Sequence, residues 1–124
     1  MPHTIQLIDG VIHTHLTGTI RRRDLAELIT RLEELEQSCD PSPNRICILG
    51  HDTIIDLDFL GMESIAARRR ATTLKNPVWS ALVARQPHQF GFLRMFQTLN
   101  THPQIEIQVF SDEETALAWV TGAR

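Results

Sequence analysis

The chain has 124 residues, of which 42% are hydrophobic and 22% are charged. This length fits one domain, and the near-average composition argues against intrinsic disorder and collagen-like repeats. Twelve basic residues against fifteen acidic residues give a net charge of -3, so no overall positive charge attracts nucleic acid. We therefore expect a single soluble globular domain with no nucleic-acid partner.

Targeting signals are not evident in the sequence. The first residues contain no basic segment followed by a long apolar run, so a secretory signal is not predicted. The longest apolar stretches are far shorter than the roughly 20 residues that cross a bilayer. Cys39 and Cys47 cannot form a disulfide framework and predict two reduced thiols rather than a redox or nucleophilic pair. These features favour a cytoplasmic protein and leave contact with a membrane surface open.

Two β-strands are predicted near the N-terminus, at 5–8 and 11–16. Asp9-Gly10 lies between them and favours the positive φ of a two-residue turn, so the strands are expected to form an antiparallel hairpin. The pattern then changes to helical spacing, with Asp24 in the first turn, where a negative charge suits the helix dipole. The apolar face of this helix is expected to consist of Leu25, Leu28, Ile29, Leu32 and Leu35.

The proline-containing segment 39–44 ends this helix, and the apolar run 45–49 predicts a strand that is covered on both faces. A loop over 50–56 is expected to lead into a second helix from about 58 to 75, which the Asn-Pro pair at 76–77 ends. Small residues along one side of this helix predict close packing onto the sheet. That side carries Leu60, Ser64, Ala67, Ala71 and Leu74.

The second half of the chain continues the alternation of strands and helices. A strand is predicted at 78–84, and another at 105–109 alternates apolar with polar residues, which is typical of an edge. The segment 111–114 predicts a capping box, in which Ser111 caps a fourth helix that carries Trp119. The third helix is marked by Phe92, Met95, Phe96 and Leu99.

The resulting order is β-β-α-β-α-β-α-β-α. It predicts a single α/β domain over 1–124, with an N-terminal hairpin and a mixed, mostly parallel sheet covered by four helices.

Three segments carry a resemblance to a known family. They read LDFLGM at 57–62, GFLRMFQ at 91–97 and VFSDEETALAWV at 109–120. With the element order, these segments resemble the SpoIIAA-like proteins, which belong with the STAS domains (sulfate transporter and anti-sigma-factor antagonist). The resemblance covers essentially the whole chain and implies a STAS-like fold and a regulatory or binding module.

The start of the second helix departs from the pattern of the phosphorylated antagonists in this superfamily. Their motif there is Asp-Ser-x-Gly, and a partner kinase modifies the serine. Asp58 and Gly61 match the Asp and the Gly, but Phe59 and Leu60 stand between them and have no hydroxyl. A phosphate needs an acceptor oxygen, so the switch cannot operate at these positions. The resemblance still leaves open an anti-sigma-factor-antagonist type of regulator that lacks the usual serine.

The apolar residues at this helix start predict a different use. The crevice beyond the carboxyl ends of the strands is the usual ligand site of an open α/β sheet. We therefore expect an apolar cleft between the starts of the second and third helices, for a hydrophobic, lipid-like ligand. The alternative is that the same residues fill the core, as Phe and Met at helical spacing usually do. The candidate ligand-binding residues are Phe59, Leu60, Met62, Phe90, Phe92 and Met95.

Other kinds of site have weaker support. His13 and His15 share one face of a strand, but a metal site needs further ligands that nothing in the sequence brings close. The chain contains no Gly-x-Ser-x-Gly elbow, no evident cysteine–histidine pair and no phosphate-binding glycine motif. We therefore expect no metal, no cofactor and no enzyme activity. An unrecognised enzyme remains as a third alternative, after a binding module and an antagonist-type regulator.

Two arginine triplets give the chain local positive charge. Residues 21–23 are expected to precede the first helix, where cations oppose the helix dipole, and 68–70 lie on the second helix. A basic patch on the second helix is predicted to receive an anionic partner, either a phospholipid headgroup or an acidic protein face. The alternative is a solvated helix face paired to Glu63 and its neighbours. The candidate patch residues are Arg68, Arg69, Arg70 and Arg85.

The leading hypothesis is therefore a non-catalytic binding or regulatory module, for a protein partner or a hydrophobic small molecule. A homodimer is a further expectation, because an edge strand such as 105–109 or the first strand can pair with its copy.

Overall fold

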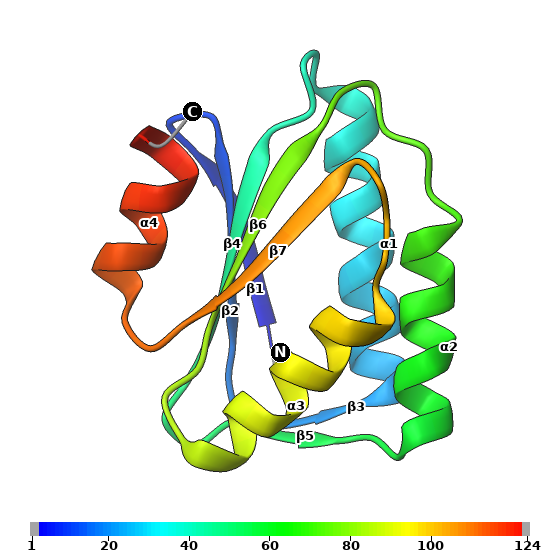
Figure 1. Cartoon of the computed structure of the whole chain (residues 1–124), viewed down its shortest axis with the longest axis vertical. Helices are drawn as coiled ribbons and strands as arrows, with labels where there is room; N and C mark the ends of the chain where they lie inside the picture. The colour runs from blue at the N-terminus through cyan, green and yellow to red at the C-terminus, as the bar shows by residue number, and fades with distance from the viewer. Residues whose placement is uncertain (1–2, 123–124) are drawn as a thin grey trace.

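Within residues 3–122, the part of the chain that the computed structural model describes, five strands form the central sheet. They are β1 (His3–Ile8), β2 (Val11–Leu16), β4 (Asn44–Leu49), β6 (Val78–Val83) and β7 (Ile105–Phe110). Their order is β1-β2-β4-β6-β7 (Figure 1). β1 is antiparallel to β2, and all other neighbouring strands are parallel. The α/β class and the mixed, mostly parallel sheet are confirmed, and β7 lies at an edge as expected.

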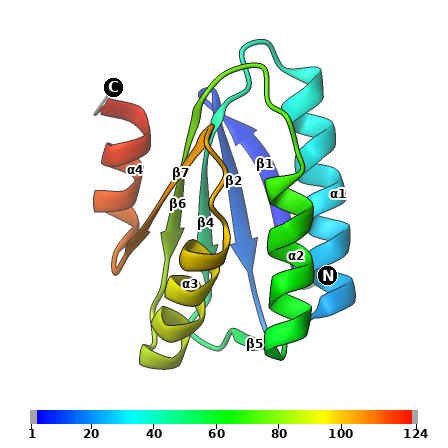
Figure 2. The same cartoon turned by 45° about the vertical axis from the view of Figure 1, so that its right-hand side comes forward.

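Four helices cover the sheet within the same residues: α1 (Arg22–Ser38), α2 (Phe59–Arg70), α3 (Pro87–Leu99) and α4 (Glu113–Gly122). α1, α2 and α3 lie on one face, and α4 lies on the opposite face (Figures 1 and 2). Each face has its own core, because strand side chains alternate between the two sides. Leu49 and Leu82 belong to the core under the three helices, whereas Ile46 and Val83 pack under α4.

The hairpin between β1 and β2 forms as its turn residues predict. Asp9 and Gly10 have φ angles of 49° and 78°, and the strand register pairs Ile8 with Val11 across the turn. Positive φ at both central residues defines the type I′ turn, whose twist matches that of the flanking strands. The predicted two-residue turn is therefore confirmed.

Two short strands depart from the expected order. β3 (Thr19–Arg21) and β5 (Ile54–Asp56) pair in parallel and form a small second sheet, so the expected loop over 50–56 is wrong for its last residues. The backbone N–H of Gly50 and the hydroxyl of Thr53 both donate to the carbonyl oxygen of Leu16, each at 2.8 Å. These bonds join the segment that leads into β3 to the segment that leads into β5. Strands of three residues are too short to show a period in the sequence.

Helix α2 is shorter than expected and buries a different side. It ends at Arg70 rather than near residue 75, because the Gln104 side chain bonds the N–H and the C=O of Leu74 at 2.9 and 2.8 Å. Leu60, at the start of the expected packing side, is 74% exposed. The side that faces the protein interior includes the larger side chains of Met62, Ile65 and Arg69. Its buried residues are Gly61, Met62, Ile65, Ala66 and Arg69.

The starts of α1 and α4 also differ from the expected boundaries. α1 begins inside the arginine triplet, at Arg22, and Asp24 Oδ2 accepts a hydrogen bond from the N–H of Arg21 at 2.9 Å. At α4 the capping side chain is Asp112 rather than Ser111, because its Oδ1 accepts from the backbone N–H three residues on, at 2.8 Å. In both helices a carboxylate satisfies an N–H group at the positive end of the helix dipole.

The first residue of β1 is a buried histidine. His3 is 3% exposed, and neither of its ring nitrogens has a hydrogen-bond partner within residues 3–122. Burial, followed by the positive charge of Arg31, lowers the pKa of His3 and outweighs the opposing effect of Glu27 and Asp24. The folded protein therefore keeps this imidazole neutral at pH values where the unfolded chain takes up a proton.

We expect the free energy of unfolding to fall as the pH drops below about 6.5, and to level off below the lowered pKa of His3. His3→Leu removes the titrating group and should flatten this part of the pH dependence. Thermal unfolding from about pH 8 to pH 5 measures the effect. His15→Leu, at an exposed position on β2, is the matched control and should keep the wild-type slope. Equal slopes for His3→Leu and the wild type would contradict this prediction.

Candidate functional site

A cavity of about 120 Å³ lies between the sheet and the layer formed by α1, α2 and α3. Aliphatic and aromatic side chains make most of its wall, and a few polar side chains complete it. From the helices, the wall includes Leu28, Leu32, Met62, Ile65, Phe92 and Phe96. The cavity therefore lies within the larger of the two cores rather than on the surface.

Strand alternation explains the sheet side of the cavity. Thr14 of β2 is aligned with Cys47 of β4, and Cys47 is aligned with Leu82 of β6. All three line the cavity, because residues aligned across a sheet point to the same face. One level away along the strands, Arg45 is aligned with Ser80, and both also line the cavity. The wall is therefore apolar over most of its length and polar at the level of Arg45 and Ser80.

The six candidate ligand-binding residues do not meet in one place. Met62 and Phe92 line the cavity. Phe59 and Leu60 lie on the outer side of the first turn of α2 and are 58% and 74% exposed, and Met95 is also exposed. Phe90 packs against the core outside the cavity wall. The structure has a cavity beneath the helices instead of the expected cleft between the two helix starts, because α2 turns Met62 inward and Phe59 and Leu60 outward.

The start of α2 has the geometry expected for a capped helix. Asp58 precedes the helix, and its Oδ1 accepts a hydrogen bond from the N–H of Gly61 at 2.7 Å. A Cβ atom at Gly61 would lie 3.2 Å from the same Asp58 oxygen and 3.1 Å from Leu57 Cδ2. Asp58 and Gly61 therefore act together as the helix cap. Neither residue between them carries a hydroxyl.

The four arginines of the predicted basic patch are all paired with carboxylates. Arg68 lies 2.8 Å from Glu33, Arg70 lies 2.5 Å from Glu63, and Arg85 lies 3.7 Å from Glu113. Arg69 is not at the surface, since its side chain is only 3% exposed. The prediction of one exposed patch is therefore wrong for Arg69, which turns toward the protein interior because it follows Met62 and Ile65 at helical spacing.

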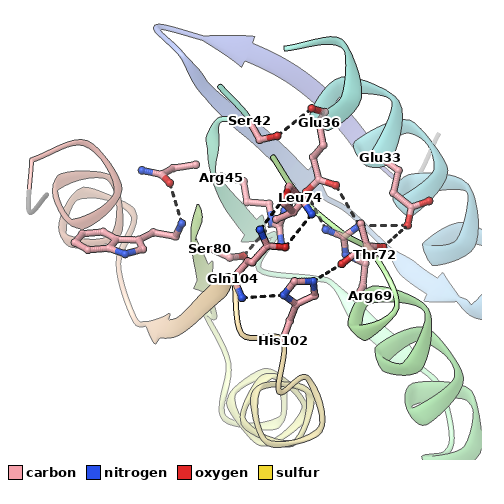
Figure 3. Close-up of polar contacts among 12 residues, drawn as sticks. Glu33, Glu36, Ser42, Arg45, Arg69, Thr72, Leu74, Ser80, His102 and Gln104 are labelled. Carbon is pink, nitrogen blue, oxygen red and sulfur yellow. Dashed lines mark hydrogen bonds and ion pairs between the residues drawn. The ribbon is translucent and has the colours of Figure 1, made fainter. Parts of the chain in front are cut away.

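Arg69 belongs to a buried ion-pair network instead of a surface patch. Glu36 of α1 is fully buried, and its carboxylate binds the guanidinium groups of Arg45 from β4 and Arg69 from α2 (Figure 3). Arg69 also reaches Glu33 at 3.3 Å. The network, defined here by Glu33, Glu36, Arg45 and Arg69, joins three elements that are far apart in the sequence. It stands beside the cavity, because both arginines line the cavity wall.

The network was not predicted, although the sequence contains two signals of it. Arg45 is the charged residue of an otherwise apolar strand, and Glu36 follows Leu32 by four residues on the apolar stripe of α1. A charge at such a position is buried only when a partner meets it. These signals could have identified Glu36 and Arg45 as buried. The burial of Arg69 depends on where α2 crosses α1, which the sequence does not indicate.

Burial controls the ionisation of the groups beside the cavity. Burial, followed by the nearby positive charge of Arg69, lowers the pKa of Arg45 to about 10, which still leaves the guanidinium charged at neutral pH. Burial raises the pKa of the Cys47 thiol to about 12, so that this cysteine is neutral and a poor nucleophile. The cavity wall therefore offers no thiolate and no free general base among its lining residues.

A second set of polar contacts holds the segment that follows α2. The N–H of Gln104 donates to His102 Nδ1 at 2.9 Å, which places the ring proton on Nε2, and Nε2 donates to the carbonyl oxygen of Thr72 (Figure 3). The side chain of Gln104 bonds both backbone groups of Leu74. These bonds attach the segment after α2 to the segment before β7.

The histidines considered as metal ligands lie on the other side of the sheet from the cavity. His13 is aligned with Ile46 and His15 with Ile48, both in the core under α4. Among the residues that the structure describes, no group of three or more His, Cys, Asp or Glu side chains is placed to hold a metal ion. His51 follows the carboxyl end of β4 and contacts Gln86 instead, with 2.6 Å between His51 Nδ1 and Gln86 Nε2.

No family model matches the chain. No curated protein is significantly similar to it. Across residues 3–122, no helix has the length and apolar character needed to cross a membrane.

Proposed function

We propose that this chain is a non-catalytic binding module whose cavity between the sheet and α1, α2 and α3 holds a small apolar ligand. The observation that carries the proposal is the cavity of about 120 Å³ with a mainly aliphatic and aromatic wall. Ligand sites are typically concave and mostly apolar, with a few polar groups that fix orientation.

The size of the cavity supports a small ligand. An engineered apolar cavity of about 150 Å³ in another protein stays dry and binds benzene, so a cavity of similar volume can take a single ring. A long lipid chain needs several times this volume, and the cavity would have to expand to hold one. A small apolar molecule therefore fits the cavity better than a long lipid chain does.

The chemistry of the wall supports binding rather than catalysis. A general base or nucleophile must be available to the reacting group. Arg45 and Arg69 are engaged by Glu36, and burial keeps the thiol of Cys47 protonated. No carboxylate and no imidazole is among the residues that line the cavity.

Toluene is a suitable probe for this proposal, with binding followed by two-dimensional NMR. We expect toluene to shift the resonances of cavity residues such as Met62 and Leu82 in a saturable way. Cys47→Leu adds volume to the wall at the centre of the sheet and should weaken toluene binding at least tenfold. Cys39→Leu places the same substitution outside the cavity wall and should leave binding unchanged.

Two outcomes would refute the proposal. One is a wild-type protein whose cavity resonances do not respond to toluene, and the other is a folded Cys47→Leu variant that binds toluene as the wild type does. The natural ligand can be sought by denaturing the purified protein and examining the released small molecules by mass spectrometry.

The exposed start of α2 favours a second candidate, a regulatory module that binds a protein partner. Phe59 and Leu60 present large apolar side chains to solvent beside the Asp58–Gly61 cap. This candidate retains the resemblance to SpoIIAA-like STAS domains but uses apolar contact in place of a phosphorylated serine. Phe59→Ser combined with Leu60→Ser distinguishes the two candidates, because it should remove partner binding and leave toluene binding unchanged.

A further inference from the structure

One polar atom beside the cavity lacks a protein partner. Asn100, which follows α3, lines the cavity and is 6% exposed. Its Oδ1 is buried, and no donor within residues 3–122 reaches it. A buried acceptor has lost its hydrogen bonds to bulk water, so a donor brought to it by a ligand restores a favourable interaction.

The charged groups of the same wall are already satisfied. Arg45 donates from Nε to Ser80 Oγ at 3.3 Å, and its guanidinium also binds Glu36. Arg69 binds Glu36 at 2.8 Å and Glu33 at 3.3 Å. Two buried guanidinium groups therefore face two carboxylates. An anionic ligand would have to compete with those carboxylates, whereas a neutral donor at Asn100 would not.

We propose that the cavity binds an uncharged molecule of about six to eight non-hydrogen atoms, with an apolar body and one hydrogen-bond donor directed at Asn100 Oδ1. This inference rests on the proposed function and narrows its ligand class to phenol-like molecules and short branched alcohols. The apolar body fills the space between Leu82 and Phe92, and the donor selects against pure hydrocarbons and against acids.

A set of matched probes tests this selectivity. Phenol supplies a ring and a donor, toluene has the same number of non-hydrogen atoms without a donor, anisole has the oxygen without a donor, and benzoate carries a negative charge. NMR titration of the full chain gives the affinity of each probe. We expect phenol to shift the side-chain amide resonances of Asn100, and anisole to bind no better than toluene.

Asn100→Leu removes the acceptor and nearly preserves the side-chain shape. We expect it to lower the ratio of phenol affinity to toluene affinity about tenfold, because only phenol loses a hydrogen bond. Thr98→Val is the control, since it removes a hydroxyl from the exposed side of α3 close to Asn100, outside the cavity wall, and should leave the ratio unchanged. Asn100→Ala removes the same acceptor and serves if the leucine variant does not fold.

The outcomes separate this inference from the proposed function. If toluene binds but the phenol-to-toluene ratio is the same in the wild type and in a folded Asn100 variant, the role of Asn100 is refuted and the cavity site stands. Tighter binding of benzoate than of phenol would also overturn the inference, because the ligand would then be recognised by arginine. If none of the four probes binds, the proposed function itself is refuted.

Discussion

Glu36→Gln is expected to lower the free energy of unfolding by about 3 to 5 kcal/mol, because it removes the carboxylate that two buried arginines share. Arg45 and Arg69 would remain inside the protein with an amide in place of the charge that now neutralises them. For a domain of this size, such a loss lowers the melting temperature by more than about 10 °C. Urea unfolding followed by circular dichroism measures the change.

The matched control removes all three charges together. A triple variant with Glu36→Leu, Arg45→Met and Arg69→Met replaces the shared ion pairs by apolar side chains of similar length. Glu33 keeps its ion pair with Arg68 in this variant. Replacing all members of a buried ion-pair cluster is often neutral or stabilising by about 1 to 4 kcal/mol, so the triple variant should be at least as stable as the wild type. A Glu36→Gln protein that unfolds at the wild-type urea concentration would contradict the buried network.

Trp119→Ala is expected to destabilise the protein by about 3 kcal/mol, through loss of the packing that holds α4 on the sheet. The indole of Trp119 stacks on that of Trp79, with ring centroids 4.7 Å apart and planes inclined by 12°. The ring centroid of Phe110 lies 5.6 Å from that of Trp119. Since Trp79 would then be the one remaining tryptophan, its fluorescence should shift toward that of a solvated indole. Equilibrium unfolding and the emission spectrum provide the two measurements.

Trp119→Phe tests whether aromatic packing is the cause. It keeps a ring against Trp79 and Phe110, and should cost less than about 1.5 kcal/mol. An alanine variant as stable as the phenylalanine variant would mean that α4 is held mainly by other contacts. Asn44 provides one such contact, because its Nδ2 donates to the carbonyl oxygen of Val120 at 2.9 Å.

The long elements could be predicted from the sequence because each contains enough residues to show a period. Alternating residues identify β7, helical spacing identifies α1, and the turn preference of Asp9-Gly10 identifies the hairpin. β3 and β5 contain three residues each and show no period. The early end of α2 was also beyond sequence analysis, since it depends on Gln104, a side chain 30 residues further along the chain.

The candidate site could be predicted only in part. Six apolar residues at the starts of α2 and α3 are predicted to line a ligand site, because such sites often lie near the ends of parallel strands. Two of them, Met62 and Phe92, line the cavity. Phe59 and Leu60 are also large and apolar, but they lie on the opposite side of α2 from Met62. Only the rotational position of each residue around the helix axis distinguishes them from Met62. Asn100 gave no signal, since its importance depends on a cavity that packing creates.

The placement of the two tryptophans has a practical consequence for experiments on this protein. Trp79 and Trp119 pack in the core under α4, whereas Cys47 lines the cavity on the other face of the sheet. Intrinsic fluorescence therefore reports the detachment of α4. Alkylation of Cys47, distinguished from that of Cys39 by peptide mass spectrometry, reports opening of the layer that contains the cavity. The rates of the two signals, recorded on the wild-type sequence, would show whether the two layers open together or one after the other.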